Sequence, residues 1–360
     1  MRIQAIMCGV PSHDYSMSFM LDVLRARGHE IVYTGFFRQK DLPEVMSDGV
    51  DCTVSSLNQP FNSRHEDFRD PARPWVLFSH GISLHKPFSM GRLGIDFSFY
   101  HMPVWLDYLR AFHDDTCTPI CTHGWGKLDQ YWKLTRECRG EVKEEVYKQH
   151  GLDPGLPLIV YAPSWSREGY ETWAKWQDSP HHNDIYVCAG TEYMSDRVLA
   201  KLNTIRANLV YLPHDMREDS EDGEGFWPSR RVELLAAADL LVSDTSSMAA
   251  EFLMMDKPIV QIARMPEDRL DGHLHLFHTP ELPPCHLGDP VYDLDTLVDI
   301  VERRLVTDEY AAVRDFWLRH AVGRPDGLCA EREAVALESC VDVYTSEPWP
   351  HEPGTVEEPA

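Results

Sequence analysis

Short apolar runs alternate with helical stretches along most of this chain, and the alternation is the strongest constraint on its fold. In the first unit, an apolar run at 3–8 precedes a stretch at 17–27 with apolar residues at helical spacing, and a second run follows at 31–34. Gly28 lies just past the basic end of this stretch, where a helix is expected to stop. Strands that alternate with helices pair in parallel, so the sequence predicts an α/β protein with doubly wound parallel sheets.

The alternation comes in two series that are separated by a turn-rich segment. In the first series, we expect further strands at 75–79 and 118–122 and a charged, largely helical stretch at 128–150. Gly and Pro then crowd residues 151–157, which we interpret as a hinge. The second series begins with a strand at 158–162. Its further predicted elements are strands at 209–212, 240–242 and 258–262 and helices at 230–238 and 294–305.

The length of the chain and the position of the hinge predict two domains. A chain of 360 residues is too long for one ordinary hydrophobic core. We therefore expect one Rossmann-like domain at 1–150 and another at 151–345. Residues 346–360 are rich in Pro and Glu and are predicted to form a disordered tail.

Charge and composition exclude several classes of function. The net charge is −24, and the basic pairs at 230–231 and 303–304 each have a glutamate close by, so nucleic-acid binding is not expected. No apolar run approaches the roughly 18 residues that span a bilayer, and the amino-terminal stretch is too polar for a signal peptide. We therefore expect a cytoplasmic protein. The histidine-rich run at 273–278 lacks further ligands at zinc spacing, so we expect no metal and no cofactor.

Polar residues that directly follow predicted strands are the candidates for function, because open parallel sheets bind ligands at the carboxyl ends of their strands. His80 follows the strand at 75–79, and a neutral imidazole there could accept a proton from a hydroxyl. Gly81 permits a tight turn after it, and Lys86 could neutralise a phosphate. A strand-capping histidine and a solvated lysine explain the same residues.

The second series has polar residues in matching positions. Ser164 and Arg167 follow the strand at 158–162 and could donate to an anion, although an ordinary loop is the favoured interpretation from spacing alone. His214 follows the strand at 209–212. A single histidine in such a place is usually structural, but histidines from two opposing domains could face one cleft.

A run of hydroxyl-bearing residues between a strand and a helix is the fourth candidate. The run comprises Ser243, Asp244, Thr245, Ser246 and Ser247. The start of a helix presents unpaired N–H groups and attracts phosphate, and Ser246 and Ser247 would add hydroxyl donors. Glu251 lies one helical turn after Ser247, where it could bind ribose hydroxyls, while Met248, Phe252 and Met255 form a core face. Capping alone would need only one of these hydroxyls.

The order of these segments resembles that of the CDP-glycerol glycerophosphotransferase family. The matching segments are His80-Gly81 with Lys86, Gly124–Asp129, Tyr161–Trp165, Pro213-His214, Ser243–Ser247 with Lys257-Pro258, and Asp326–Arg332. The resemblance runs from about 75 to 335. This family makes teichoic-acid and capsule polymers with two facing Rossmann-like domains, the glycosyltransferase B architecture, so the resemblance implies the same arrangement here.

The resemblance also implies roles for individual residues. His80 would be the general base on the acceptor hydroxyl, in an acceptor-side first domain, and His214 would contact the donor pyrophosphate in the second. Ser246 and Ser247 would bind the donor phosphate. Gly124 and Asp129 are carried over as further candidates. The chain departs from the family pattern in having Thr245 in place of Tyr, Glu251 where Asp is frequent, and Ser166 between Trp165 and Arg167.

The implied activity is the transfer of a glycerol-phosphate or related polyol-phosphate unit. The donor would be CDP-activated, the acceptor a hydroxyl of a cell-surface glycan or polymer precursor at the inner face of the membrane, and the by-product CMP. Two alternatives stay open. The first is a sugar-nucleotide glycosyltransferase or a UDP-N-acetylglucosamine 2-epimerase-like enzyme of the same fold, and the second is a nucleotide-binding protein without activity.

Overall fold

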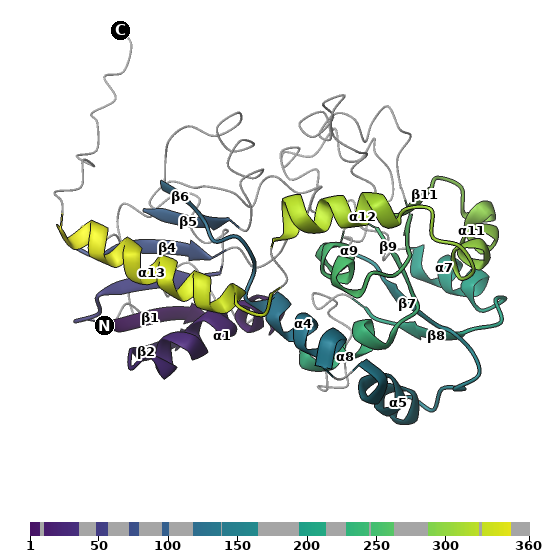
Figure 1. Cartoon of the computed structure of the whole chain (residues 1–360), viewed down its shortest axis with the longest axis horizontal. Coiled ribbons are helices and arrows are strands. Elements are labelled where there is room, and N and C mark those ends of the chain that lie inside the picture. The colour runs from purple at the N-terminus through teal and green to yellow at the C-terminus, as the bar shows by residue number, and fades with distance from the viewer. Residues whose placement is uncertain are drawn as a thin grey trace, which may run out of the picture.

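Two parallel β-sheets form the frame of the protein in the computed structural model (Figure 1). The structure describes residues 1–7, 11–35, 48–56, 72–78, 96–100, 118–137, 139–164, 194–213, 228–244, 246–262, 287–323 and 326–346. The predicted α/β class with parallel sheets is confirmed. No helix in these ranges is long and apolar enough to cross a membrane. The predicted tail at 346–360 lies almost wholly outside the described residues.

The first sheet has the strand order β2-β1-β3-β4-β5-β6. Its strands are β1 (Arg2–Met7), β2 (Glu30–Gly35), β3 (Cys52–Ser55), β4 (Trp75–Phe78), β5 (Phe97–Tyr100) and β6 (Thr118–Cys121). Every residue of β3, β4 and β5 is buried, as expected for strands covered on both faces. Helix α1 (Pro11–Ala26) joins β1 to β2 and ends just before Gly28, whose φ of 90° confirms the predicted helix stop.

The second sheet has the order β11-β10-β9-β7-β8, with β7 and β9 near its centre. The strands are β7 (Leu158–Ala162), β8 (Asn208–Tyr211), β9 (Leu240–Ser243), β10 (Ile259–Ile262) and β11 (Asp289–Val291). The helical segments around it are α7 (Ser195–Leu202), α8 (Pro228–Ala237), α9 (Ser247–Phe252), η5 (Leu253–Met255), η6 (Leu294–Thr296), α11 (Leu297–Arg304), α12 (Ala311–Trp317) and η7 (Leu318–Val322).

The two faces of β7 belong to different core clusters. Leu158, Val160 and Ala162 point into a cluster that continues through the junction into the first sheet. Ile159 and Tyr161 point to the opposite face, toward α7 and α11. This division follows from the two-residue period of a strand. One continuous hydrophobic core therefore connects both sheets.

Two helices lead from the first sheet to the second. They are α4 (Lys127–Glu137) and α5 (Arg139–Gln149), whereas the sequence predicted one largely helical stretch at 128–150. Both α4 and α5 pack against α8 of the second half.

The last helix, α13 (Cys329–Ser346), returns to the first sheet and lies along it beside α1 (Figure 1). Tyr344 packs edge-to-face on Phe97 of β5, with ring centroids 6.3 Å apart. Arg27 forms ion pairs with Glu331 at 2.5 Å and with Glu338 at 2.7 Å. The predicted second domain at 151–345 contains this helix, although the helix completes the core of the first sheet. The domain division at 150 stays a prediction.

The start of α13 docks on the segment that follows β6. The backbone N–H of Gly126 donates to Oε1 of Glu333 at 3.0 Å, and Glu333 is completely buried. Burial raises the pKa of Glu333 well above its ordinary value, and the Gly126 hydrogen bond opposes this shift. A Cβ on Gly126 would lie 2.5 Å from Oε2 of Glu333, so a larger residue there would have to displace this carboxylate.

Glu333→Gln should make the protein less sensitive to alkaline pH. The raised pKa means that the folded chain holds this proton more tightly than the unfolded chain, so stability is full below the ordinary pKa of 4.5 and falls as pH rises. The fall is up to about 1.4 kcal/mol per pH unit for one proton. Glutamine keeps the acceptor for Gly126 without titrating. Urea unfolding from pH 5 to 9 should therefore show a shallower decline for the variant.

The matched control is Glu302→Gln, because Glu302 is exposed on α11. Its stability profile should follow that of the unmodified protein. Identical pH profiles for Glu333→Gln and the control would contradict a buried, protonated Glu333.

Candidate functional site

The carboxyl ends of β7 and β9 bring two of the predicted donor segments into contact. In the parallel register, Ala162 lies beside Ser243, and the Ser243 hydroxyl donates to the Ala162 carbonyl oxygen at 2.6 Å. The backbone N–H of Ser164 donates to both carboxylate oxygens of Asp244 at 2.9 Å. Ser164 and the polar run that begins at Ser243 therefore share one edge of the second sheet.

Asp244 organises the loop between β9 and α9. It is 2% exposed, and its Oδ1 also accepts the backbone N–H of Ser246 at 3.0 Å. Its carbonyl oxygen accepts from the side-chain amide of Gln261 at 3.0 Å. The carboxylate thus satisfies the backbone N–H groups of Ser164 and Ser246, which is a structural task. Its predicted contact with donor phosphate stays a prediction.

Ser246 caps helix α9, and Ser247 is the first helical residue. The Ser246 hydroxyl accepts the N–H of Met248 at 3.3 Å, which satisfies one of the free N–H groups of the first turn. Ser247 is half-buried. Met248, Phe252 and Met255 are buried, which confirms the predicted core face. Capping therefore accounts for the hydroxyl of Ser246. The hydroxyl of Ser243 is accounted for by its hydrogen bond to the carbonyl oxygen of Ala162 on β7.

The hydroxyl of Ser164 stands apart from this network. Ser164 is 1% exposed, and its Oγ has no hydrogen-bond partner within the described ranges. Buried hydroxyl groups in proteins nearly always have a partner. An unpaired hydroxyl at the end of a central strand can donate to an anion, which agrees with the phosphate-binding role predicted for this residue.

Glu251 takes part in a buried polar network at the junction of the two halves. The Nζ of Lys127 lies 2.9 Å from each carboxylate oxygen, and the hydroxyl of Tyr131 donates to Oε2 at 2.6 Å. Burial and the negative charge of Glu251 hold the pKa of Tyr131 well above its ordinary value, so the phenol stays protonated and donates. The predicted contact of Glu251 with ribose stays a prediction.

Gly124 and Asp129 lie against α13. Asp129 accepts the backbone N–H groups of Cys329 at 2.9 Å and Ala330 at 2.8 Å, so it caps this helix from another part of the chain. Burial raises the pKa of Asp129, and these two hydrogen bonds oppose the shift. Gly124 has a φ of 152°, and a Cβ there would lie 2.5 Å from Sγ of Cys329. These observations give both candidates a role in docking α13.

Several predicted site residues fall outside the described ranges. They are His80, Gly81, Lys86, Arg167, His214 and Thr245. The histidine-rich run at 273–278 also lies outside them. Within the ranges that the structure describes, no group of three or more His, Cys, Asp or Glu side chains is arranged to hold a metal ion.

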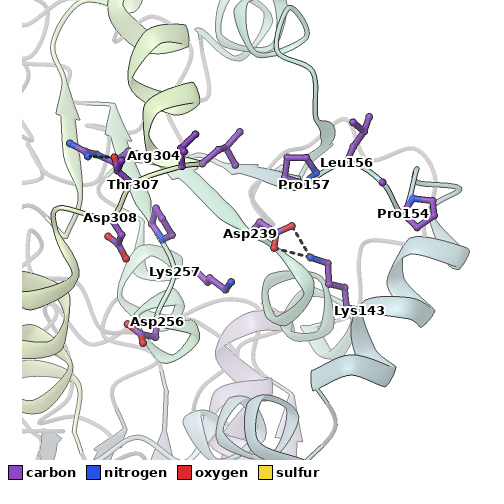
Figure 2. Close-up of a pocket in the computed structure, with 14 residues that line it drawn as sticks. Lys143, Pro154, Leu156, Pro157, Asp239, Asp256, Lys257, Arg304, Thr307 and Asp308 are labelled. Carbon is purple, nitrogen blue, oxygen red and sulfur yellow. Dashed lines mark hydrogen bonds and ion pairs between the residues drawn. The ribbon is translucent and has the colours of Figure 1, made fainter.

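A cavity of about 540 Å³ opens at the other end of the second sheet (Figure 2). Its lining comes from the hinge at 154–157, from the residues just before β9 and β10, and from the end of α11. Figure 2 shows Lys143 paired with Asp239, and the two side chains lie 2.8 Å apart. Lys257, Asp256 and Asp308 also line the cavity. Charges of both signs line it, so they select no single class of ligand. It is separate from the edge that carries Ser164 and Asp244.

Sequence reasoning missed Lys127 and Tyr131 as partners of Glu251. Lys127 belongs to a segment that carries the family resemblance, but the resemblance implies no role for it. A usable signal was present, because residues four apart on a helix share one face, and a basic and a phenolic residue occur there at that spacing. Their partner Glu251, which lies 124 residues after Lys127 and 120 residues after Tyr131, gave no local sign of the pairing.

Comparison with known proteins agrees with the sequence resemblance. The family model described as CDP-glycerol:poly(glycerophosphate) glycerophosphotransferase matches residues 109–312, which is more than half of the chain. The teichoic acid glycerol-phosphate primase of Bacillus spizizenii is 26% identical over 205 residues, which are 55% of this chain and 49% of the primase. The chain thus spans about half the length of this curated relative.

Solved structures share the fold at low sequence identity. The wall teichoic acid polymerase TagF aligns over 96% of this chain and 90% of its own, with a TM-score of 0.56 and 13% identity. A Listeria monocytogenes structure provisionally named UDP-N-acetylglucosamine 2-epimerase aligns over 95% of this chain and 97% of its own, with a TM-score of 0.55 and 13% identity. The predicted glycosyltransferase B architecture is confirmed.

Asp244→Asn should destabilise the protein by about 2 kcal/mol, because an amide replaces one carboxylate oxygen by a donor that faces buried backbone N–H groups. Urea unfolding measures the change. Asp256→Asn is the matched control: Asp256 is exposed at a φ of 52°, a region that Asn adopts well, so a change within about 0.5 kcal/mol is expected. Equal effects of the two substitutions would show that Asp244 does not hold the loop.

Proposed function

Because the chain belongs to the CDP-glycerol:poly(glycerophosphate) glycerophosphotransferase family, we propose that it transfers a glycerol-phosphate unit from a CDP-activated donor to a hydroxyl group and releases CMP. The observation that carries this proposal is the family match, which spans 109–312 and so includes Ser164 together with Ser243, Asp244 and Ser246. The primase from Bacillus spizizenii, whose name describes a glycerol-phosphate transfer, supports the same chemistry.

The proposed reaction is a displacement at the β-phosphorus of the donor. The acceptor oxygen forms a new P–O bond, the bond between the β-phosphorus and the bridging oxygen breaks, and CMP leaves with that oxygen. His80 takes the proton of the attacking hydroxyl as general base. His214, Arg167 and the hydroxyl groups near the start of α9 stabilise the charge that develops on phosphate. The last of these groups lie beside the free N–H groups of a helix start.

We propose that the acceptor is a glycan or polyol-phosphate polymer reached at the inner face of the membrane. The basis is the wall-polymer chemistry in the names of the primase and of TagF, one structure of which was obtained after a soak with CDPG. The second candidate is chemistry on a UDP-sugar, because the Listeria monocytogenes structure has the same fold. A thermal-shift panel with CDP, UDP, GDP and CMP separates them, and a preference for UDP would favour the second candidate.

His80→Ala should lower the rate of CMP release from CDP-glycerol and a polyol-phosphate primer by about 10²- to 10⁴-fold, the usual contribution of a general base. His214→Ala should also abolish most activity, through loss of phosphate stabilisation. His320→Ala is a control, because His320 is exposed on η7. Full activity of His80→Ala, or no CMP release by the unmodified protein with any CDP donor, would contradict the proposal.

Ser164→Ala should weaken donor binding without lowering stability. Its hydroxyl is buried and unpaired within the described ranges, so the unliganded protein loses no hydrogen bond with it. Calorimetric titration with CDP should show a loss of affinity of about tenfold, equivalent to one hydrogen bond to a charged group. Ser243→Ala should behave in the opposite way, since that hydroxyl already donates to Ala162: stability falls and CDP affinity changes little. Unchanged CDP affinity in Ser164→Ala would exclude Ser164 from the donor site.

A further inference from the structure

The helix that begins at the proposed donor-phosphate edge is fixed at both of its ends. At its start, Asp244 holds the loop through the N–H groups of Ser164 and Ser246. One turn later, Glu251 is bound by Lys127 and Tyr131 of α4. Helix α9 is short, with six residues, so its own hydrogen bonds do little to set its direction. These contacts therefore determine where its first turn points.

The contact at Glu251 is buried on both sides. Glu251 is 2% exposed, Lys127 is 8% exposed and Tyr131 is fully buried. Opposite charges in such surroundings attract each other more strongly than at a surface, and a phenolic hydrogen bond satisfies a further lone pair. Lys127 also lies over the ring of Trp125, with Nζ 5.2 Å from the centroid, which fixes its position further.

Residues of α1 and α8 surround the network. Arg231 of α8 lies close enough for its charge to interact with Glu251 and Tyr131, and burial lowers its pKa. Tyr15 of α1 donates to the side chain of Gln130 on α4, and its pKa is raised to about 12 by burial, with a smaller contribution from the charge of Glu251. Four helices, α1, α4, α8 and α9, thus meet around a single buried carboxylate.

We propose that Glu251 is a positioning residue, which acts through Lys127 and Tyr131 to orient the start of α9 toward the donor phosphates, and does not bind the ribose. The inference rests on the proposed function. Lys127 Nζ and the Tyr131 hydroxyl use three acceptor positions on its two oxygens, so the carboxylate is committed to α4. The pairing also connects the donor edge to α4, the helix that leaves the first sheet. A movement of one half relative to the other would therefore shift α9.

Two nucleotides test the positioning role against a ribose contact. Calorimetric titrations with CDP and with 2′-deoxy-CDP compare the unmodified chain with Glu251→Gln. A positioning residue predicts that the substitution weakens both nucleotides by the same factor, about tenfold for a coupling of ordinary size. A loss confined to CDP, with the affinity for 2′-deoxy-CDP retained, would identify Glu251 as a ribose ligand and overturn the proposal.

Substitution of the partners tests whether Glu251 acts through α4. Lys127→Met leaves a buried carboxylate without its cation and should weaken CDP binding about tenfold. The double variant Lys127→Met with Glu251→Gln lacks the same contact as either single variant, so it should bind CDP about as weakly as each of them and not a hundredfold more weakly. Tyr131→Phe removes only the phenolic hydrogen bond and keeps the shape of the site, so it should lower CDP affinity less than Lys127→Met does. Lys133→Met makes the same change at an exposed position of α4 and should bind CDP normally.

Urea unfolding of the same variants separates the possible outcomes. If Lys127→Met lowers stability but the folded variant binds CDP as tightly as the unmodified chain, the network is only structural and the proposal fails. Additive effects of Lys127→Met and Glu251→Gln on unfolding would also overturn it, since a coupled pair is non-additive. If the unmodified chain binds no cytidine nucleotide, the proposed function fails, and the unfolding cycle still decides whether the pair exists.

Discussion

The docking of α13 on the segment between β6 and α4 is the contact on which the arrangement of both sheets depends. The chain leaves the first sheet through Gly124 and returns past Gly323, and a Cβ on Gly323 would lie 2.5 Å from the α-carbon of Gly124. Asp129 caps α13 at the same place, and Gly126 donates to Glu333. The segment that leaves the first sheet and the segment that returns to it therefore pack backbone against backbone at Gly124 and Gly323, where only glycine permits so close an approach.

Most strands could be predicted because Gly, Pro or polar residues bound their apolar runs, as around β7 and β9. The strands that were missed are β3, β5 and β11, which have only three or four residues. Serine in β5 and proline in β11 interrupt their apolar pattern. Parallel neighbours supply their hydrogen bonds, and β11 tolerates proline as an edge strand. Tertiary contacts, which a local pattern does not contain, stabilise these segments.

The candidate site could be predicted in position but less well in the roles of its residues. Polar residues at the carboxyl ends of predicted strands indicated Ser164 and the run that begins at Ser243 as ligand-binding candidates, and the strand order brings them together. Composition could not show that the side chains of Ser243 and Asp244 form hydrogen bonds with neighbouring backbone groups, because these bonds depend on the register of β7 beside β9. The partners of Glu251 are equally non-local. Hydroxyl groups in such a run look alike in sequence, and they differ only in which hydrogen-bond partners the folded chain gives them.

The position of α13 also has a consequence for the order in which the protein can be built. A ribosome releases the strands of the first sheet early, but the helix that lies along this sheet and packs on Phe97 extends to residue 346. The first half must therefore wait, with apolar surface uncovered, until residue 346 has been synthesised, whereas the described strands of the second sheet emerge before α13. In this protein the half that is made first is completed last.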